Sequence, residues 1–462
     1  MQRCEQILAD LEDAMEEHAA VRPWRLYLNG ILFAERDHDW ASAERTYVTL
    51  LSEEAIEPQL QIRTLLALGI AHHYQGKWPE AIHAFTCSLP IAEAEGESIS
   101  KIKALNEISA TYQQGFIYGD YDKMALQDAL DYGTQALKLL ATLDSEQVNQ
   151  LEGILLNNLG LIHKSLGNWD RAIQCYKRDL ALSEIQDNRY GMGLSYGNLA
   201  EVWHEMGPDS WPLAQNAYQN ALDLIREAGN LYEEIEALTN LATLYLDMDD
   251  SATAIEHFES AIALVESLRA RTTSADSRTG FFSTVVKTYA GAVDAYLAAD
   301  QPMDAFNVAE RSRSRTLIEM LAEQPTRTTR HVPVSLLTEE QRIREHLRTL
   351  VNQSEPDKTD IAQVEEQWDD LQHKVQLVSA EYAAFQEFYP LTLQEIQRRL
   401  PSDTALIAYF TSATRIVALV ITYASFTVVP LALKPDVLGL AFDDQGYIHR
   451  LLPASDGRLL EP

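Results

Sequence analysis

The amino-acid sequence predicts an all-α protein built from repeated helical hairpins, followed by a short antiparallel strand-rich segment. Two observations lead to this prediction. A pattern of small and aromatic residues recurs along most of the chain, with 40 residues from Gly160 to Ala200 and 42 from Ala200 to Ala242. After residue 401 this pattern gives way to short β-branched runs separated by polar turns, which are typical of strands.

The repeated pattern places small and bulky residues at fixed offsets on two successive helices. Its small first-helix residues are Gly69, Gly160, Ala200 and Ala242, each followed three positions later by a ring: His72, His163, Trp203 and Tyr245. Its second-helix alanines are Ala81, Ala172, Ala214 and Ala254, each followed four positions later by Phe85, Tyr176, Tyr218 or Phe258. Small residues let two antiparallel helices approach closely, and the rings fill the space beside that contact. In three of the four copies a glycine (Gly76, Gly167 or Gly207) lies at the turn, where it can end the first helix.

Weaker copies at residues 24–50, 102–141 and 281–315 bring the expected number of hairpins to about seven. The order of small residue, ring, glycine, alanine and ring resembles the tetratricopeptide repeat over roughly residues 20–320. The usual period of that repeat is about 34 residues, so the longer period here resembles its long-helix variety. The resemblance implies a superhelix whose first helices line a concave, polypeptide-binding groove.

Asparagines recur on the first helices beside the small positions. Asn158, Asn198 and Asn240 lie two residues before the small residue, and Asn106 and Asn157 lie one position earlier in their repeats. Because an amide offers both donors and an acceptor, a row of asparagines can pair with the main chain of an extended peptide. The alternative is that these amides cap or cross-link neighbouring helices without contacting a ligand.

Charge indicates which partners are favoured. The chain has 37 Lys+Arg against 69 Asp+Glu, a formal net charge of -32, which disfavours nucleic acid and anionic membranes. Groove positions are acidic on balance, since Glu201, Glu205, Glu236 and Asp247 outnumber Lys164 and Arg63. We therefore expect a protein or extended-peptide partner, basic or neutral in charge. A solvated charged face without a ligand is the alternative.

No secretory signal or membrane-spanning run is recognised, and the three cysteines are far apart, which favours a cytoplasmic protein. No cofactor or metal is expected. His72, His73 and His163 are interpreted as packing residues because no cysteine or carboxylate cluster accompanies them.

The chain is divided into a repeat array over residues 1–322, a linker and helical hairpin over 323–400, and a strand-rich segment over 401–462. The runs TALIAYF, RIVALVIT and SFTVVPLAL predict a three-stranded meander. Together with the preceding repeats and the helix AFNVAERSRSRTLIEMLA, they are similar to the start of a CHAT domain, a caspase-like module joined to such repeats. That resemblance implies an α/β domain with a catalytic His and Cys on loops after later strands.

No catalytic residue is assigned, because His449 lacks the small neighbours of the family's catalytic His and no cysteine follows Cys175. We expect the α/β domain to be incomplete and the sequence to be truncated. The preferred interpretation is an interaction module that regulates a caspase-like peptidase whose catalytic part is absent from this chain. The alternatives are a scaffold or peptide-sensing regulator without protease activity, and an active cysteine peptidase.

Overall fold

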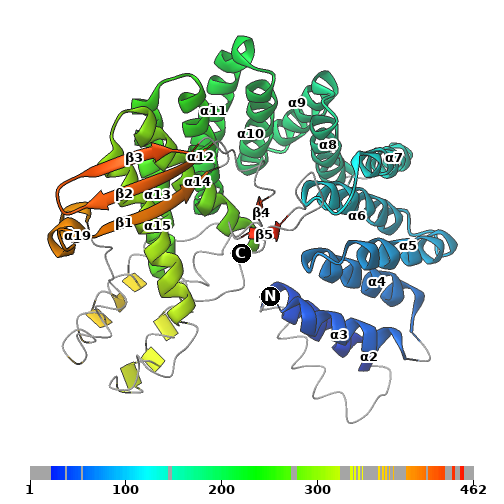
Figure 1. The fold of residues 1–462 in the computed structure, drawn as a ribbon. Helices are drawn as coiled ribbons and strands as arrows, with labels where there is room; N and C mark the ends of the chain where they lie inside the picture. The colour runs from blue at the N-terminus through cyan, green and yellow to red at the C-terminus, as the bar shows by residue number, and fades with distance from the viewer. Residues whose placement is uncertain are drawn as a thin grey trace. The chain divides into compact units, whose positions relative to one another are not determined.

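The computed structural model describes residues 22–36, 39–53, 56–143, 148–271, 278–322, 392–412, 415–431, 440–442 and 448–451, with isolated positions between 333 and 378 (Figure 1). The chain divides into two compact units, Met1–Ala217 and Tyr218–Pro462, called here the N-terminal and C-terminal units. Each unit is described by itself.

The N-terminal unit is a succession of helices joined by short turns. Its helices are α2 (Arg22–Ile31), α3 (Trp40–Leu51), α4 (Pro58–Tyr74), α5 (Trp78–Ala94), α6 (Ser98–Ile117), α7 (Lys123–Leu140), α8 (Val148–Ser165), α9 (Trp169–Ile185), α10 (Arg189–Glu205) and the first part of α11 (Trp211–Ala228). Within the hairpins, α4 packs on α5, α6 on α7 and α8 on α9. Between hairpins, α3 packs on α4, α5 on α6, α7 on α8 and α9 on α10.

The C-terminal unit continues the hairpins and then changes to strands. It contains α12 (Leu231–Asp247), α13 (Ser251–Arg271), α14 (Arg278–Ala298), α15 (Pro302–Ala322), α19 (Leu393–Arg399), β1 (Ala405–Thr411), β2 (Ile416–Thr422), β3 (Phe426–Pro430), β4 (Leu440–Phe442) and β5 (Ile448–Leu451). The described part of the chain thus holds seven successive helix pairs from α2 to α15, as the sequence predicted. None of its helices is long and apolar enough to cross a bilayer.

The small residues and rings meet inside the hairpins as predicted. A Cβ built on Gly69 would lie 2.4 Å from the ring of Phe85, and one built on Gly160 would lie 2.4 Å from the ring of Tyr176. Both rings are fully buried. The first hairpin repeats this contact between Gly30 and Tyr47.

The turns between the paired helices use the left-handed conformation. Gly76 and Gly167 have φ of 68° and 75°. The copy without a glycine places Asp249 there, with φ of 60° and its N–H donating to the carbonyl of Leu246 at 3.1 Å. Aspartate tolerates the left-handed region better than most residues, which explains how the hairpin of α12 and α13 turns without glycine.

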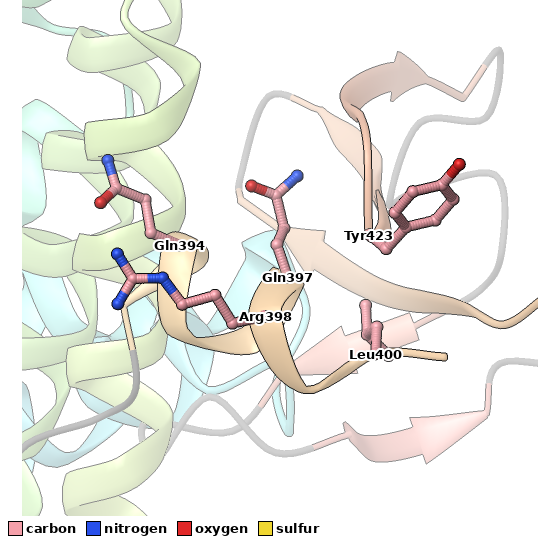
Figure 2. A pocket seen from close by; sticks show the side chains of 5 residues that line it. All are labelled: Gln394, Gln397, Arg398, Leu400 and Tyr423. Carbon is pink, nitrogen blue, oxygen red and sulfur yellow. The ribbon is translucent and has the colours of Figure 1, made fainter. Parts of the chain in front are cut away.

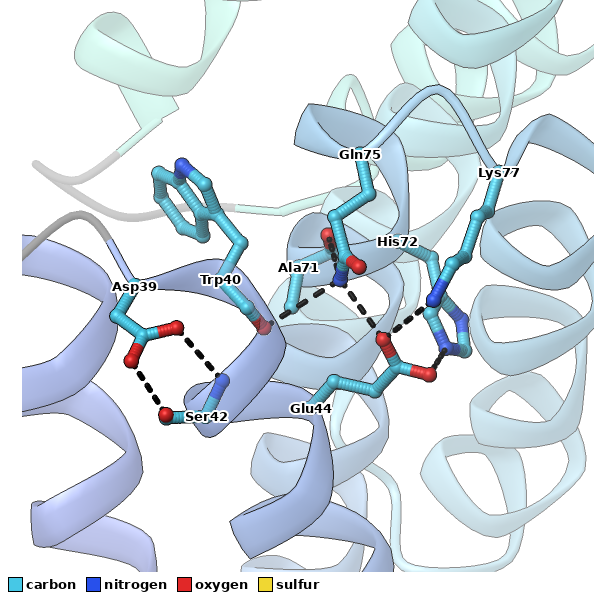
Figure 3. Close-up of polar contacts among 8 residues, drawn as sticks. All are labelled: Asp39, Trp40, Ser42, Glu44, Ala71, His72, Gln75 and Lys77. Carbon is cyan, nitrogen blue, oxygen red and sulfur yellow. Dashed lines mark hydrogen bonds and ion pairs between the residues drawn. The ribbon is translucent and has the colours of Figure 1, made fainter. Parts of the chain in front are cut away.

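A partly buried carboxylate joins the first two hairpins (Figure 3). Glu44 on α3 accepts from Lys77 Nζ at 2.6 Å and from Gln75 Nε2 at 2.9 Å, and His72 Nε2 lies 3.3 Å from its Oε1. Burial by itself would raise the pKa of Glu44, but the bonds from Lys77 and Gln75 and the charges of His72 and Lys77 outweigh it and lower the pKa. His72 is therefore a buried structural residue, and no group of three or more potential metal-binding side chains occurs among the described residues.

The strands form the predicted meander, in the order β1-β2-β3 with antiparallel pairing. Leu406 pairs with Ile421 and Val417 with Pro430. One face of this sheet shares a core with Phe306 of α15 and Leu393 of α19 (Figure 1).

Two polar contacts also join the sheet to the last hairpin. Arg415 Nε lies 3.1 Å from Asp294 Oδ1 on α14, and Arg313 of α15 donates to the carbonyl of Tyr409 on β1. The strands β4 and β5 form a separate hairpin that includes His449. The helical hairpin expected within residues 323–400 lies almost entirely outside the described residues, and the proposed domain boundaries stay predictions.

Candidate functional site

Side-chain bonds connect the first helices of successive hairpins in the N-terminal unit. His73 Nδ1 of α4 lies 2.9 Å from Thr111 Oγ1 of α6, which joins the second and third hairpins. Further along, polar residues of α6, α8 and α10 form three groups of side-chain contacts between these helices, called together the first-helix face. It comprises Asn106, Glu107, Asn157, Asn158, Lys164, Asn198, Glu201 and Glu205.

The asparagines of this face bond to one another across neighbouring helices. Asn158 Nδ2 donates to Asn106 Oδ1 at 2.8 Å, and Asn198 Nδ2 donates to Asn157 Oδ1 at 2.6 Å. The geometry is the same in both cases: the amide two residues before the small position donates to the amide three residues before it on the preceding first helix. The sequence allowed these residues either to cross-link helices or to face a ligand, and in the structure they make cross-links.

In Asn157, Asn158 and Asn198 the cross-link engages only one of the two polar atoms of the side-chain amide. Within the described part of the chain, Asn158 Oδ1, Asn198 Oδ1 and Asn157 Nδ2 form no further hydrogen bond. The three residues are half-buried. The first-helix face therefore presents two acceptors and one donor, held in position by the bonds at their other ends.

Lys164 pairs with two of the carboxylates of the face. Lys164 Nζ donates to Glu201 Oε2 and lies 3.8 Å from Glu205 Oε1. Burial alone would lower the pKa of Lys164, whose side chain is 18% exposed, but the two carboxylates outweigh this effect and raise it. Lys164 thus stays protonated and offsets part of the acidic charge expected at these positions.

Asn240 lies in the C-terminal unit and is described separately. It is 8% exposed, and its Oδ1 accepts from Lys287 Nζ of α14 at 2.8 Å. Thr239 beside it meets Thr288 at 2.7 Å between the same two helices. Asn240 thus joins two first helices through a lysine rather than through a second asparagine.

Glu107 belongs to the first-helix face but was missed by the sequence analysis. It lies two residues before Ser109, the small residue of its repeat, and so occupies the position of Asn158 and Asn198. Burial raises the pKa of its carboxyl, while the bond from Asn106 and the charge of Lys103 lower it only partly. Aligning residues 102–141 with the stronger repeats would have identified this residue.

A surface depression in the C-terminal unit lies between α19 and the turn after β2. It has a volume of about 460 Å³ and is lined by Gln394, Gln397, Arg398, Leu400 and Tyr423 (Figure 2). Gln397 Nε2 is engaged with the carbonyl of Thr422 at 3.1 Å. Figure 2 shows Arg398 and Tyr423 pointing to different sides, so the polar groups do not converge on one point.

Two segments of the chain match sequence models of the tetratricopeptide repeat. The matches cover residues 155–190, which include the later part of α8 and all of α9, and residues 209–267, which include α11, α12 and most of α13. They confirm the predicted repeat type for these segments. A search of curated protein sequences found no significant match.

Solved structures with similar folds share little sequence with this chain. The apo form of RapI is 12% identical and covers 84% of this chain and 95% of its own, with a TM-score of 0.49. A Rap protein complexed with competence and sporulation factor is 15% identical, with coverages of 81% and 92% and a TM-score of 0.48. A signal transduction ATPase with a tetratricopeptide repeat sensor from Pyrococcus horikoshii is 14% identical, with coverages of 70% and 44% and a TM-score of 0.49. These likenesses concern the fold alone.

Proposed function

We propose that this chain is a polypeptide-binding module and that the first-helix face of its N-terminal unit holds an extended segment of the partner. The observation that carries the proposal is the set of amide ends left without a partner at Asn157, Asn158 and Asn198. Main-chain N–H groups of a peptide can donate to the two free carbonyl oxygens, and a peptide carbonyl can accept from Asn157 Nδ2. Main-chain pairing of this kind tolerates different side chains in the partner.

Pre-organisation supports this function. An amide that is bonded at one end has already lost most of its side-chain freedom, so binding a peptide at the other end costs less conformational entropy. The overall charge of -32 favours a neutral or basic partner and disfavours nucleic acid. The paired Glu201 and Glu205 retain access to solvent, Glu205 with 49% of its side chain exposed.

The proposal is tested by replacing Asn158, Asn198 and Asn240 with alanine, together and singly. The probe is a library of acetylated, amidated nonapeptides captured on the immobilised full chain and quantified by mass spectrometry. Because a neutral hydrogen bond contributes about 1 kcal/mol and Asn158→Ala with Asn198→Ala removes two of them, we expect this double variant to weaken peptide capture by about thirtyfold. Helicity should change little, because alanine is a good helix former.

Asn168→Ala is the matched control, since Asn168 is exposed at the start of α9 and its side chain caps no helix N–H. Asn240→Ala alone shows whether the C-terminal unit contributes. Peptide capture that is equal in the wild type and the Asn158 and Asn198 variants would remove the amides from the binding site.

We further propose that the repeats form the regulatory part of a caspase-like peptidase. The similarity of the strand-rich segment to the start of a CHAT domain supports this, as does the core that β1–β3 share with α15, through which a change in the last hairpin would reach the sheet. The chain itself is proposed to be non-catalytic. Incubation of the purified chain with a broad set of fluorogenic peptides tests this, and turnover would favour the active-peptidase alternative.

A further inference from the structure

Glu107 differs from the other residues at its position in the repeat. Asn158 and Asn198 each donate to an asparagine on the preceding first helix. The preceding first helix for Glu107 is α4, whose residues at the matching positions are Leu66 and Ala67. Neither side chain can form a hydrogen bond, so α4 supplies no polar side chain to Glu107 at these positions.

Among the described residues no cation forms an ion pair with this carboxylate, and the charge of Lys103 only partly offsets the effect of burial on its pKa. Among the described residues its one side-chain bond is from Asn106 Nδ2 to Oε1, at 3.3 Å, and it forms no ion pair. The side chain is half-buried, and burial raises the pKa of Glu107. A carboxylate that has lost water without forming an ion pair is destabilised, and it recovers this energy when a cation binds.

We infer that Glu107 is a recognition site for a lysine or arginine side chain of the bound polypeptide, located beside the amides that hold its main chain. Asn106 connects the two parts of the site, because it donates to Glu107 and accepts from Asn158. The inference rests on the proposed function and adds a specificity that free amides alone would lack. A basic residue would be selected at one position of an otherwise permissive peptide.

The test uses the full chain and four nonapeptide libraries whose central residue is Arg, Lys, Gln or Glu, all acetylated and amidated so that no terminal charge competes. Because a charge-assisted bond contributes about 1.5 kcal/mol or more, we expect the Arg and Lys libraries to be captured about tenfold better than the Gln library. Glu107→Gln should abolish this preference, so that the Arg and Lys libraries are captured no better than the Gln library. Glu184→Gln, an equal charge change at an exposed position of α9, should preserve it.

The outcomes separate the inference from the function on which it rests. Capture of all four libraries to the same extent, or a basic preference that survives Glu107→Gln, would overturn the inference and leave the binding module intact. Absence of any peptide capture would overturn both. Far-ultraviolet circular dichroism of Glu107→Gln checks that the isosteric replacement folds. Loss of the preference in folded protein supports the assignment.

Discussion

Gly160 on α8 lies directly against the ring of Tyr176 on α9, so close that a Cβ on the glycine would stand 2.4 Å from Cε1 of the tyrosine. Tyr176 is fully buried and packs with Leu199 and Val202 of α10. The contact therefore determines the spacing within one hairpin and against the next. It is the structural reason for the small residue at this position.

Gly160→Ala is expected to destabilise the protein, because the added methyl group must displace a buried ring. Overpacking of this kind costs about 1 to 3 kcal/mol, which exceeds the gain of about 1 kcal/mol from helix propensity. Gly197→Ala on α10 is the control: no atom lies within 4 Å of its added Cβ, so the same substitution should stabilise the protein. Urea denaturation measures the change in the free energy of unfolding for each variant. A change of the same sign in both variants would contradict the packing argument.

Glu44→Gln should lower the free energy of unfolding by about 1 kcal/mol at neutral pH, since the carboxylate accepts from Lys77 and Gln75 and is 24% exposed. The pKa of Glu44 is lowered in the folded state, so its contribution is present above the unfolded pKa and is lost as the pH falls through the folded value. The difference between variant and wild type should therefore shrink below about pH 4. Denaturation at several pH values checks this, with exposed Glu256→Gln as control. A pH-independent difference would contradict the assignment.

Phe306→Ala should loosen the attachment of β1–β3 to the last hairpin. Phe306 is fully buried and meets Phe426 edge to face, with ring centroids 5.8 Å apart. Removing such a ring from a core costs about 3 to 5 kcal/mol. Hydrogen exchange of β2 should become faster in the variant and stay unchanged in Met303→Ala, where the side chain is 53% exposed on the same helix. Unchanged hydrogen-exchange protection of β2 in both variants would show that the sheet is held by other contacts.

The candidate site was predictable in composition but not in its bonding. The positions of Asn157, Asn158 and Asn198 follow from the repeat, because the helical period places them on the same side of each first helix. Which amide donates to which depends on the offset between neighbouring hairpins. That offset depends on packing between residues some 40 positions apart, such as Asn157 and Asn198, and no local pattern specifies it. The position of Glu107 can likewise be read from its repeat, but its lack of an ion pair cannot, because that depends on what α4 presents beside it.

By itself, the sequence determined the helical hairpins, their number and the later meander, because small residues, rings, turn glycines and β-branched runs act over one hairpin or one strand pair. The tertiary structure decided the rest. It joined the asparagines in pairs, set Lys164 between Glu201 and Glu205, and left the carboxylate of Glu107 without an ion pair among the described residues. The physical reason is that a polar side chain acquires its partner only when the helices stack, and that stacking is determined by buried volume rather than by the polar residues themselves.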